Sequence, residues 1–155
     1  MTRYLVDTGV FVRWFIDQDG WEHARKIRDE FVQGAVILET VDFVRIETAN
    51  VLRKAGLLKG ILTPETFATL ARAIDDLGIL AHITDADVLE RGARLATSRN
   101  VAVYDAIVVV RAMELGIPLL TSDQRLCRAV DGLVQTELLQ GVGAPTTNPG
   151  HSKPL

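Results

Sequence analysis

The chain has 155 residues, which suits one domain with a sizeable core, and its 48% hydrophobic content excludes an intrinsically disordered polymer. A net charge of −3 excludes a chain-wide attraction to nucleic acid, so any such contact must come from local basic clusters. The single cysteine, Cys127, excludes an internal disulfide and predicts a cytoplasmic location, and no apolar run reaches the roughly 18 residues of a membrane-spanning helix, so we expect no membrane association.

The first half of the chain alternates short apolar runs with amphipathic segments. The apolar runs at 4–6 and 35–38 predict two buried strands. Helices are predicted around them, at residues 10–16, 21–33 and 42–55.

The second half continues the alternation. Thr63 and Pro64 predict a helix start, because threonine caps helix N-termini and proline suits the first turn, and Gly78 ends that helix. Strands are predicted at 79–83, 117–120 and 133–138, and helices from Thr84 or Asp85 to Arg99 and over 123–130.

Two structures fit the stretch 101–110. Its β-branched residues are typical of a strand, but a strand would bury Asp105 in the middle of a ladder. A helix that begins near Asp105 places this acid at the positive end of the helix dipole. We therefore predict a helix.

Strands that alternate with helices predict an α/β protein with a mainly parallel central sheet flanked by helices, in three α/β/α layers. We expect a single domain over residues 1–140. Residues 141–155 are rich in glycine and proline and have no apolar period, which predicts a flexible C-terminal tail.

Four acidic residues occupy positions where a charge is unusual. Asp7 and Asp123 each follow a predicted strand, and ligand sites form beyond the carboxyl ends of parallel strands. Glu47 lies at the edge of the apolar face of its helix, and Asp105 directly precedes the apolar residues 106–110. A carboxylate in such a place is costly unless it is paired, hydrogen-bonded or bound to a metal.

If the four carboxylates converge, they raise one another's pKa and cannot all be charged without a cation between them. Oxygen ligands favour the hard ions Mg²⁺ or Mn²⁺ over zinc, and the histidines His23, His82 and His151 lack the spacing of metal ligands. Such an ion lowers the pKa of water and stabilises charge on a leaving oxygen, which is the chemistry of phosphodiester cleavage.

The acids lie in four motifs, LVDTGV (5–10), ETANVLR (47–53), VYDA (103–106) and PLLTSD (118–123). In this order, over residues 4–138, they resemble the PIN-domain proteins and, among those, the VapC-type toxins of bacterial toxin–antitoxin pairs. The resemblance implies a PIN fold and a metal-dependent endoribonuclease that cleaves RNA with Asp7, Glu47, Asp105 and Asp123. It also implies an antitoxin partner and a homodimer, and the mean hydropathy of +0.18 favours the homodimer as well. Gly9 stands where such proteins often have serine, and we expect no effect of that difference on the metal.

Each acid also has an ordinary interpretation when it is taken alone. Asp7 fits a turn at a strand end, Asp105 and Asp123 fit helix caps, and Glu47 fits an exposed helix position. Their joint occurrence in the family order favours a site. Asp42 competes with Glu47 for its role but better fits a helix N-cap.

Other polar residues fall beside the predicted site. Thr8, Thr121 and Ser122 are expected to orient the aspartates, or else to satisfy the backbone of turns. Five basic residues could either contact RNA phosphates or be ordinary exposed surface charges. They are Arg13, Arg45, Arg53, Lys54 and Arg125. We take Arg13, Arg53 and Arg125 as the candidate RNA contacts.

Three other functions compete with the ribonuclease. A haloacid-dehalogenase-type phosphatase needs a second aspartate two residues after the first, where this chain has Gly9. A receiver domain needs an acid beside Asp7 and a phospho-acceptor aspartate after the third strand, where the chain has Thr84 and Asp85. A PIN fold that only binds a partner is the third alternative, and the complete set of four acids argues against it.

Overall fold

The structure is a computed structural model that describes residues 1–143. Its strands form one sheet in the order β3-β2-β1-β4-β5, and every pairing among them is parallel. The described strands are β1 (Thr2–Val6), β2 (Val36–Val41), β3 (Leu80–His82), β4 (Leu119–Thr121) and β5 (Thr136–Leu138). The parallel sheet predicted from the sequence is confirmed.

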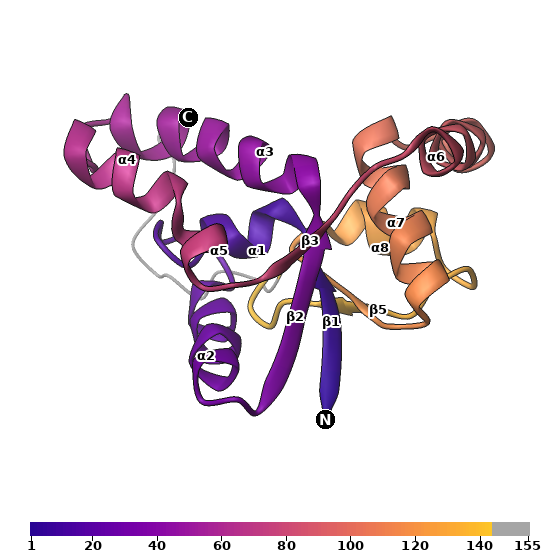
Figure 1. Ribbon diagram of the computed structural model, residues 1–155, viewed down its shortest axis with the longest axis horizontal. Coiled ribbons are helices and arrows are strands. Elements are labelled where there is room, and N and C mark those ends of the chain that lie inside the picture. Colours follow the sequence, from indigo (N-terminus) through magenta and orange to yellow (C-terminus); the bar gives the residue numbers. More distant parts are fainter. Residues whose placement is uncertain (144–155) are drawn as a thin grey trace, which may run out of the picture.

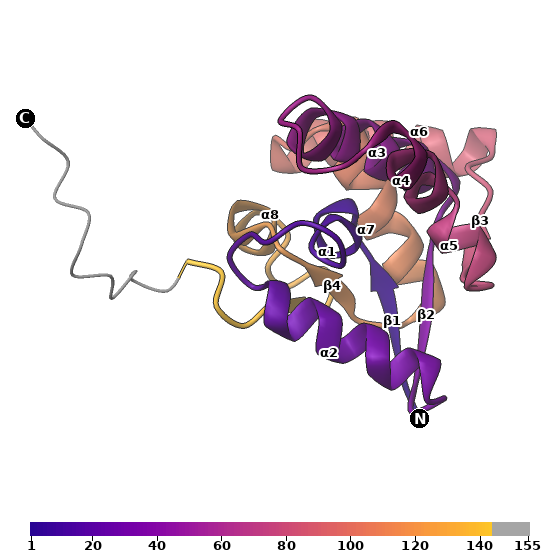
Figure 2. The ribbon, with the colours of Figure 1, turned by 90° about the vertical axis from the view of Figure 1, so that its left-hand side faces the viewer.

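Helices cover both faces of this sheet, as Figure 1 shows for α2 and α7 on opposite sides of β1 and β2. The described helices are α1 (Thr8–Val12), α2 (Trp21–Val32), α3 (Asp42–Leu52), α4 (Pro64–Ala71), α5 (Ala73–Asp76), α6 (Ala86–Arg99), α7 (Val103–Leu115) and α8 (Gln124–Ala129). α3 packs on α1 with α4 beside it (Figure 2), and α6 packs on α7. The predicted three-layer α/β/α fold is therefore also confirmed.

β1 is the central strand, and it ends at the edge of the sheet where the acids gather. Leu5 and Val6 are fully buried. The register pairs Leu5 with Leu119 and Val6 with Leu120, and the N–H of Asp7 donates to the carbonyl of Leu120 at 3.1 Å. The carboxyl ends of β1 and β4 therefore lie side by side.

The stretch 101–110 is helical, as predicted. Ala102 is the N-cap of α7, and residues 106–110 are all buried, because the sheet covers one side of this helix and α6 covers another. Gly92 of α6 permits the close packing, since a Cβ there would lie 2.8 Å from the Cγ1 of Ile107. An apolar run long enough to be ambiguous thus becomes a helix that is buried almost all round.

Some element boundaries differ from the prediction. α1 begins at Thr8, because the Asp7 side chain caps it, and it ends at Val12 instead of residue 16. The strands predicted at 79–83 and 133–138 are both shorter, since only three residues of each pair with a neighbouring strand.

The region after α3 also differs. The chain continues from α3 as one π-helical turn, Arg53–Leu57, and the helix does not stop at Gly56. Gly56 is buried in that turn, where a Cβ would lie 2.5 Å from the Leu62 side chain. Thr63 caps α4 as predicted, accepting the N–H of Thr66 at 3.1 Å, but the predicted helix is divided into α4 and α5.

Residues 141–143 form a turn against the body of the protein, and Val142 packs on the core. The rest of the predicted tail, residues 144–155, lies outside the described residues. Within residues 1–143, no helix is long and apolar enough to span a bilayer.

Candidate metal centre

Asp7 lies at the junction of β1 and α1, where it caps the helix. Its Oδ1 accepts the backbone N–H of Thr8 at 2.8 Å, and its Oδ2 accepts the hydroxyl of Thr121 at 3.0 Å. Only 8% of the residue is exposed. The strand end therefore holds a buried carboxylate in a fixed orientation.

Glu47 approaches this position from α3, which packs on α1. The hydroxyl of Thr8 donates to Oε1 of Glu47 at 2.5 Å, so Thr8 contacts both acids. The competing acid, Asp42, binds Thr84 instead. Its carboxylate accepts the N–H and the hydroxyl of Thr84 at 3.0 and 2.8 Å.

Asp105 and Asp123 come from the first turn of α7 and from the loop before α8. Asp123 caps α8 by accepting the N–H of Leu126 at 3.0 Å. The N–H of Asp123 itself donates to the hydroxyl of Thr121 at 3.0 Å. Thr121 therefore links Asp123 to Asp7.

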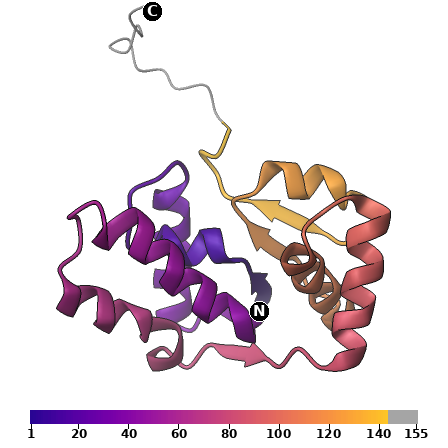
Figure 3. The ribbon, with the colours of Figure 1, turned by 90° about the horizontal axis from the view of Figure 1, so that it is seen from above.

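The four acids line one pocket of about 300 Å³. From above, α3 and α7 lie on either side of the end of β1 (Figure 3). The remaining lining residues are Thr8, Gly9, Val12, Arg13, Gln18, Val51 and Ser122. The fold thus brings together four acids that the sequence carries in four separate segments.

The carboxylates of this pocket repel one another and are poorly solvated. Burial raises the pKa of Asp7, two hydrogen bonds from threonines oppose the rise, and the charges of Glu47 and Asp123 add to it. Burial, followed by the charges of the three other acids, raises the pKa of Asp105 to about 6. Both shifts mean that the negative form lacks a compensating positive charge.

Glu39 shows how the chain stabilises a buried acid by its own side chains. It is 5% exposed on β2, where Arg3 donates to its Oε2 from Nε at 3.0 Å and from Nη2 at 2.6 Å, and His82 lies 3.0 Å from its Oε1. Burial raises the pKa of Glu39, but the hydrogen bonds of His82 and Arg3 outweigh this and lower it below the usual range. In residues 1–143 no ion pair of this kind serves the four acids of the pocket.

The donor set fits a hard divalent cation, because it consists of carboxylate oxygens around one negative pocket. Within residues 1–143, no group of three or more acidic, histidine or cysteine side chains is arranged so that it could hold a metal ion as it stands. The carboxylates of Asp7, Glu47 and Asp123 instead face protein hydrogen-bond donors. A divalent cation would replace the mutual repulsion with attraction, so these three acids and Asp105 are the residues that would hold it.

Arg13 lines the same pocket, and its hydrogen-bond acceptors among residues 1–143 are neutral. Its Nη1 donates to the carbonyl of Gly9 at 2.9 Å and to Oγ of Ser122 at 3.0 Å, and its Nε donates to the carbonyl of Asp19 at 2.7 Å. Burial lowers the pKa of Arg13, and the nearby charge of Asp19 partly opposes this shift. The guanidinium is thus fixed in place with its charge available to an anion in the pocket.

The other basic residues have different surroundings. Arg125 lines a second pocket that also includes Asp105 and Asp123. Arg53 is exposed on the π-helical turn and does not line the acidic pocket, and Arg45 is bound to Asp75 by two contacts of 2.6 Å.

Gly9 has a role that the sequence did not reveal. A Cβ at Gly9 would lie 2.0 Å from Oγ of Ser122, so a larger residue would displace the serine that binds Arg13. Ser122, which we expect to orient an aspartate or to satisfy the backbone of a turn, accepts a hydrogen bond from Arg13. No local sequence pattern signals this contact, because only the fold brings Gly9, Ser122 and Arg13 together.

Comparisons with known proteins indicate the family of the chain. A family model of the PIN domain matches residues 4–132. Ribonuclease VapC3 of Pyrobaculum aerophilum is 28% identical over 134 residues, which cover 85% of this chain and 98% of that protein.

Two solved structures share the fold. VapC20 of Mycobacterium tuberculosis, described as a toxin that cleaves the sarcin–ricin loop, has a TM-score of 0.66 and 16% identity, covering 86% of this chain and 98% of that chain. VapBC2 of Rickettsia felis, bound to a DNA fragment from its promoter, has a TM-score of 0.63 and 13% identity, covering 88% of this chain and 98% of that chain.

Proposed function

The chain belongs to the PIN-domain family, and from that premise we propose that it is a Mg²⁺- or Mn²⁺-dependent endoribonuclease, the toxin of a toxin–antitoxin pair. The observation that carries the proposal is the convergence of four carboxylates on one pocket without a protein cation paired to them. The names of the similar proteins, a VapC ribonuclease and VapC toxins, support it.

Some residues of the pocket bind the metal, and another binds the RNA. Asp7, Glu47, Asp105 and Asp123 hold the cation. When bound, that ion lowers the pKa of a water and neutralises charge on the leaving oxygen. Arg13, fixed by its three neutral acceptors, binds the scissile phosphate itself, not the phosphate of a neighbouring nucleoside, and places a positive charge where negative charge develops during cleavage.

The test is cleavage of single-stranded RNA by the purified protein, with Mg²⁺ or Mn²⁺ and with EDTA. We expect cleavage only with the ion. Asp7→Asn should lower the rate at least about a hundredfold, because residues that merely support metal ligands already cost 10–100-fold. Asp87→Asn is the control, since Asp87 is an exposed acid in the first turn of α6. Wild-type cleavage that survives EDTA, or a fully active Asp7→Asn protein, would contradict the proposal.

A second copy of the chain is the proposed partner for an apolar surface beside the acidic pocket. Ile46, Ile83, Leu89 and Tyr104 are between 50% and 75% exposed. Ile46 on α3 and Tyr104 on α7 line one hollow with Phe43, Asn50 and the acidic Glu47, and the rings of Phe43 and Tyr104 lie 5.5 Å apart. Ile83 follows β3, and Leu89 lies on α6. Exposed apolar patches of this kind mark protein interfaces.

The antitoxin is proposed to lie along α3 and to send an arginine into the acidic pocket. An arginine fork binds carboxylates in pairs, so it would compete with the metal. Leu58 and Ile61, each 61% exposed just beyond α3, offer apolar surface to such a partner. A toxin that acts on cellular RNA under an antitoxin's control would work in the cytoplasm.

The alternative from a different class is a PIN fold that only binds a partner. It predicts no specific uptake of Mg²⁺ or Mn²⁺ by the pocket. The raised pKa of Asp105 favours the metal site, because a pure scaffold has no need to keep repelling carboxylates together.

A further inference from the structure

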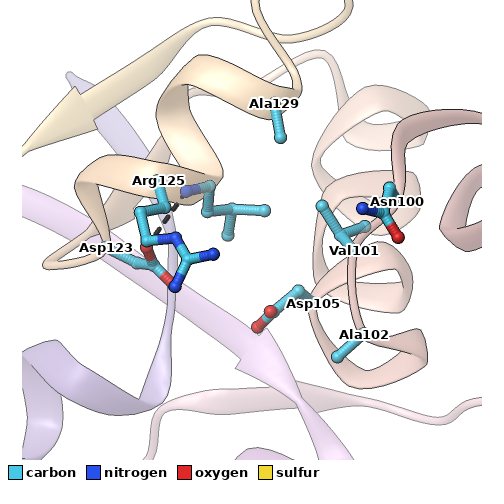
Figure 4. Close-up of a pocket in the computed structure, with 8 residues that line it drawn as sticks. Asn100, Val101, Ala102, Asp105, Asp123, Arg125 and Ala129 are labelled. Atoms are coloured by element: carbon cyan, nitrogen blue, oxygen red, sulfur yellow. Dashed lines mark hydrogen bonds between the residues drawn. The ribbon is translucent and has the colours of Figure 1, made fainter.

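A second pocket, also of about 300 Å³, adjoins the acidic pocket and shares Asp105 and Asp123 with it. Its other residues form two walls, as Figure 4 shows, with Asn100, Val101 and Ala102 on the α6–α7 side and Arg125 and Ala129 on α8. Leu126 of α8 also lines the pocket. An RNA strand with one phosphate at the four acids would therefore place its neighbouring nucleotide in this pocket.

The two walls are tied to each other. Arg99, the last residue of α6, donates from Nη1 to the carbonyls of Ala129 and Asp131 at 3.4 and 3.5 Å. Leu126 is 2% exposed and its N–H is bonded to Asp123, which anchors the start of α8. A pocket that already exists in the free protein binds its ligand with a smaller loss of conformational entropy.

The lining suits one nucleoside and its phosphate. Val101, Ala102 and Ala129 offer small apolar surfaces to a flat ring. The amide of Asn100 carries both a donor and an acceptor, as a base edge does, and the exposed guanidinium of Arg125 can bind a phosphate. Base edges and faces become accessible in this way only when RNA is unpaired.

Asn100 has a backbone conformation that makes it a clean target for mutation. It is the C-cap of α6, with φ 52° and ψ 54° in the left-handed region. Glycine adopts this conformation without steric cost, so Asn100→Gly deletes the amide and preserves the backbone.

We propose that this pocket binds one unpaired nucleoside of the RNA beside the scissile phosphate, with Asn100 reading the base edge and Arg125 binding that nucleoside's own phosphate. The proposal rests on the proposed ribonuclease function and adds to it a residue that determines sequence specificity. Asn100 and Arg125 have separate roles, because a base contact sets sequence preference while a phosphate contact sets affinity for every sequence.

The test uses the full-length protein and a pool of short single-stranded RNAs of random sequence, whose cleavage products are sequenced. Wild type should prefer one base, about fivefold or more, at one position flanking the cut. Asn100→Gly should abolish that preference and leave the other positions unchanged. Arg125→Gln should keep the preference, weaken binding of all sequences, and reduce the salt dependence of log affinity by about 0.7.

Gln33→Ala, which removes an exposed amide after α2, is the matched control and should behave as wild type. Melting temperatures of the variants separate a loss of recognition from a loss of folding. The same base preference in Asn100→Gly and wild type would overturn the specificity role while the ribonuclease proposal stands. If wild type cleaves no RNA, both proposals fail, and the metal titration described in the Discussion then shows whether the acidic pocket still binds a cation.

Discussion

Asp105→Asn should make the metal-free protein more stable at neutral pH, although it removes a residue of the proposed site. The pKa of Asp105 is raised from 3.8 to about 6, first by burial and then by the three neighbouring carboxylates. At about 1.4 kcal/mol per pKa unit, this corresponds to about 3 kcal/mol. Because Asp105 is only half-buried, solvent screening reduces the expected gain to about 1–2 kcal/mol.

The pH dependence of this stabilisation follows from how many protons the folded and unfolded states bind. Between about pH 4 and pH 6 the folded chain keeps the Asp105 proton while the unfolded chain loses it, so the free energy of unfolding falls as the pH rises. The penalty is complete above pH 6 and absent below pH 4. Asparagine has no such titration. The difference between variant and wild type should therefore be near zero at low pH and largest at neutral pH.

Thermal unfolding in EDTA, monitored by circular dichroism, measures the effect. A gain of 1–2 kcal/mol should raise the melting temperature at neutral pH by about 3–6 °C for a chain of this size. Asp87→Asn is the matched control, since it also removes an acid from the first turn of a helix but is exposed. Loss of the favourable helix-dipole interaction should leave it level or slightly destabilised. If Asp105→Asn behaves like this control, or its effect is independent of pH, the repulsion argument is wrong.

The remaining predictions concern the arginine, the dimer and the antitoxin. Gly9→Ala should lower stability by about 1–3 kcal/mol and slow RNA cleavage, because the new Cβ would displace Ser122 from Arg13, and adding Ser122→Ala should restore stability but not the rate. Light scattering should give twice the 17.0 kDa of the chain for wild type and the monomer mass for Ile46→Glu, whereas the exposed control Val32→Glu should remain dimeric; a wild-type monomer would refute the interface. Adding the antitoxin should release bound Mn²⁺, seen by electron spin resonance, and full Mn²⁺ occupancy in an inhibited complex would contradict arginine entry.

Sequence reasoning located the acids for two different reasons. Asp7 and Asp123 follow apolar strands, and parallel topology places such positions at one edge of a sheet. Glu47 and Asp105 lie on helices, and no local pattern fixes where a helix face meets that edge. Their unusual positions beside apolar residues marked them as candidates, and the resemblance to PIN-domain proteins joined them to the other two acids. The fold then brought all four into one pocket.

What the sequence did not predict depends on contacts between distant segments. The bond between Arg13 and Ser122 joins residues 109 positions apart, and only the folded chain shows why Gly9 must be small there. The sequence allows either Thr84 or Asp85 as the N-cap of α6. In the structure Thr84 binds Asp42, and Asp85 is the cap.

Asp7, Glu47, Asp105 and Asp123 are proposed to hold a divalent cation together. Calorimetric titration of the metal-free protein with Mn²⁺ tests this proposal most directly, with Asp7→Asn and Asp105→Asn beside wild type and Asp87→Asn as the control. We expect saturable heat for wild type and the control, and at least about tenfold weaker binding for each of the two variants, since each removes one ligand charge. No saturable heat for wild type, or equal affinity in all four proteins, would contradict the metal centre.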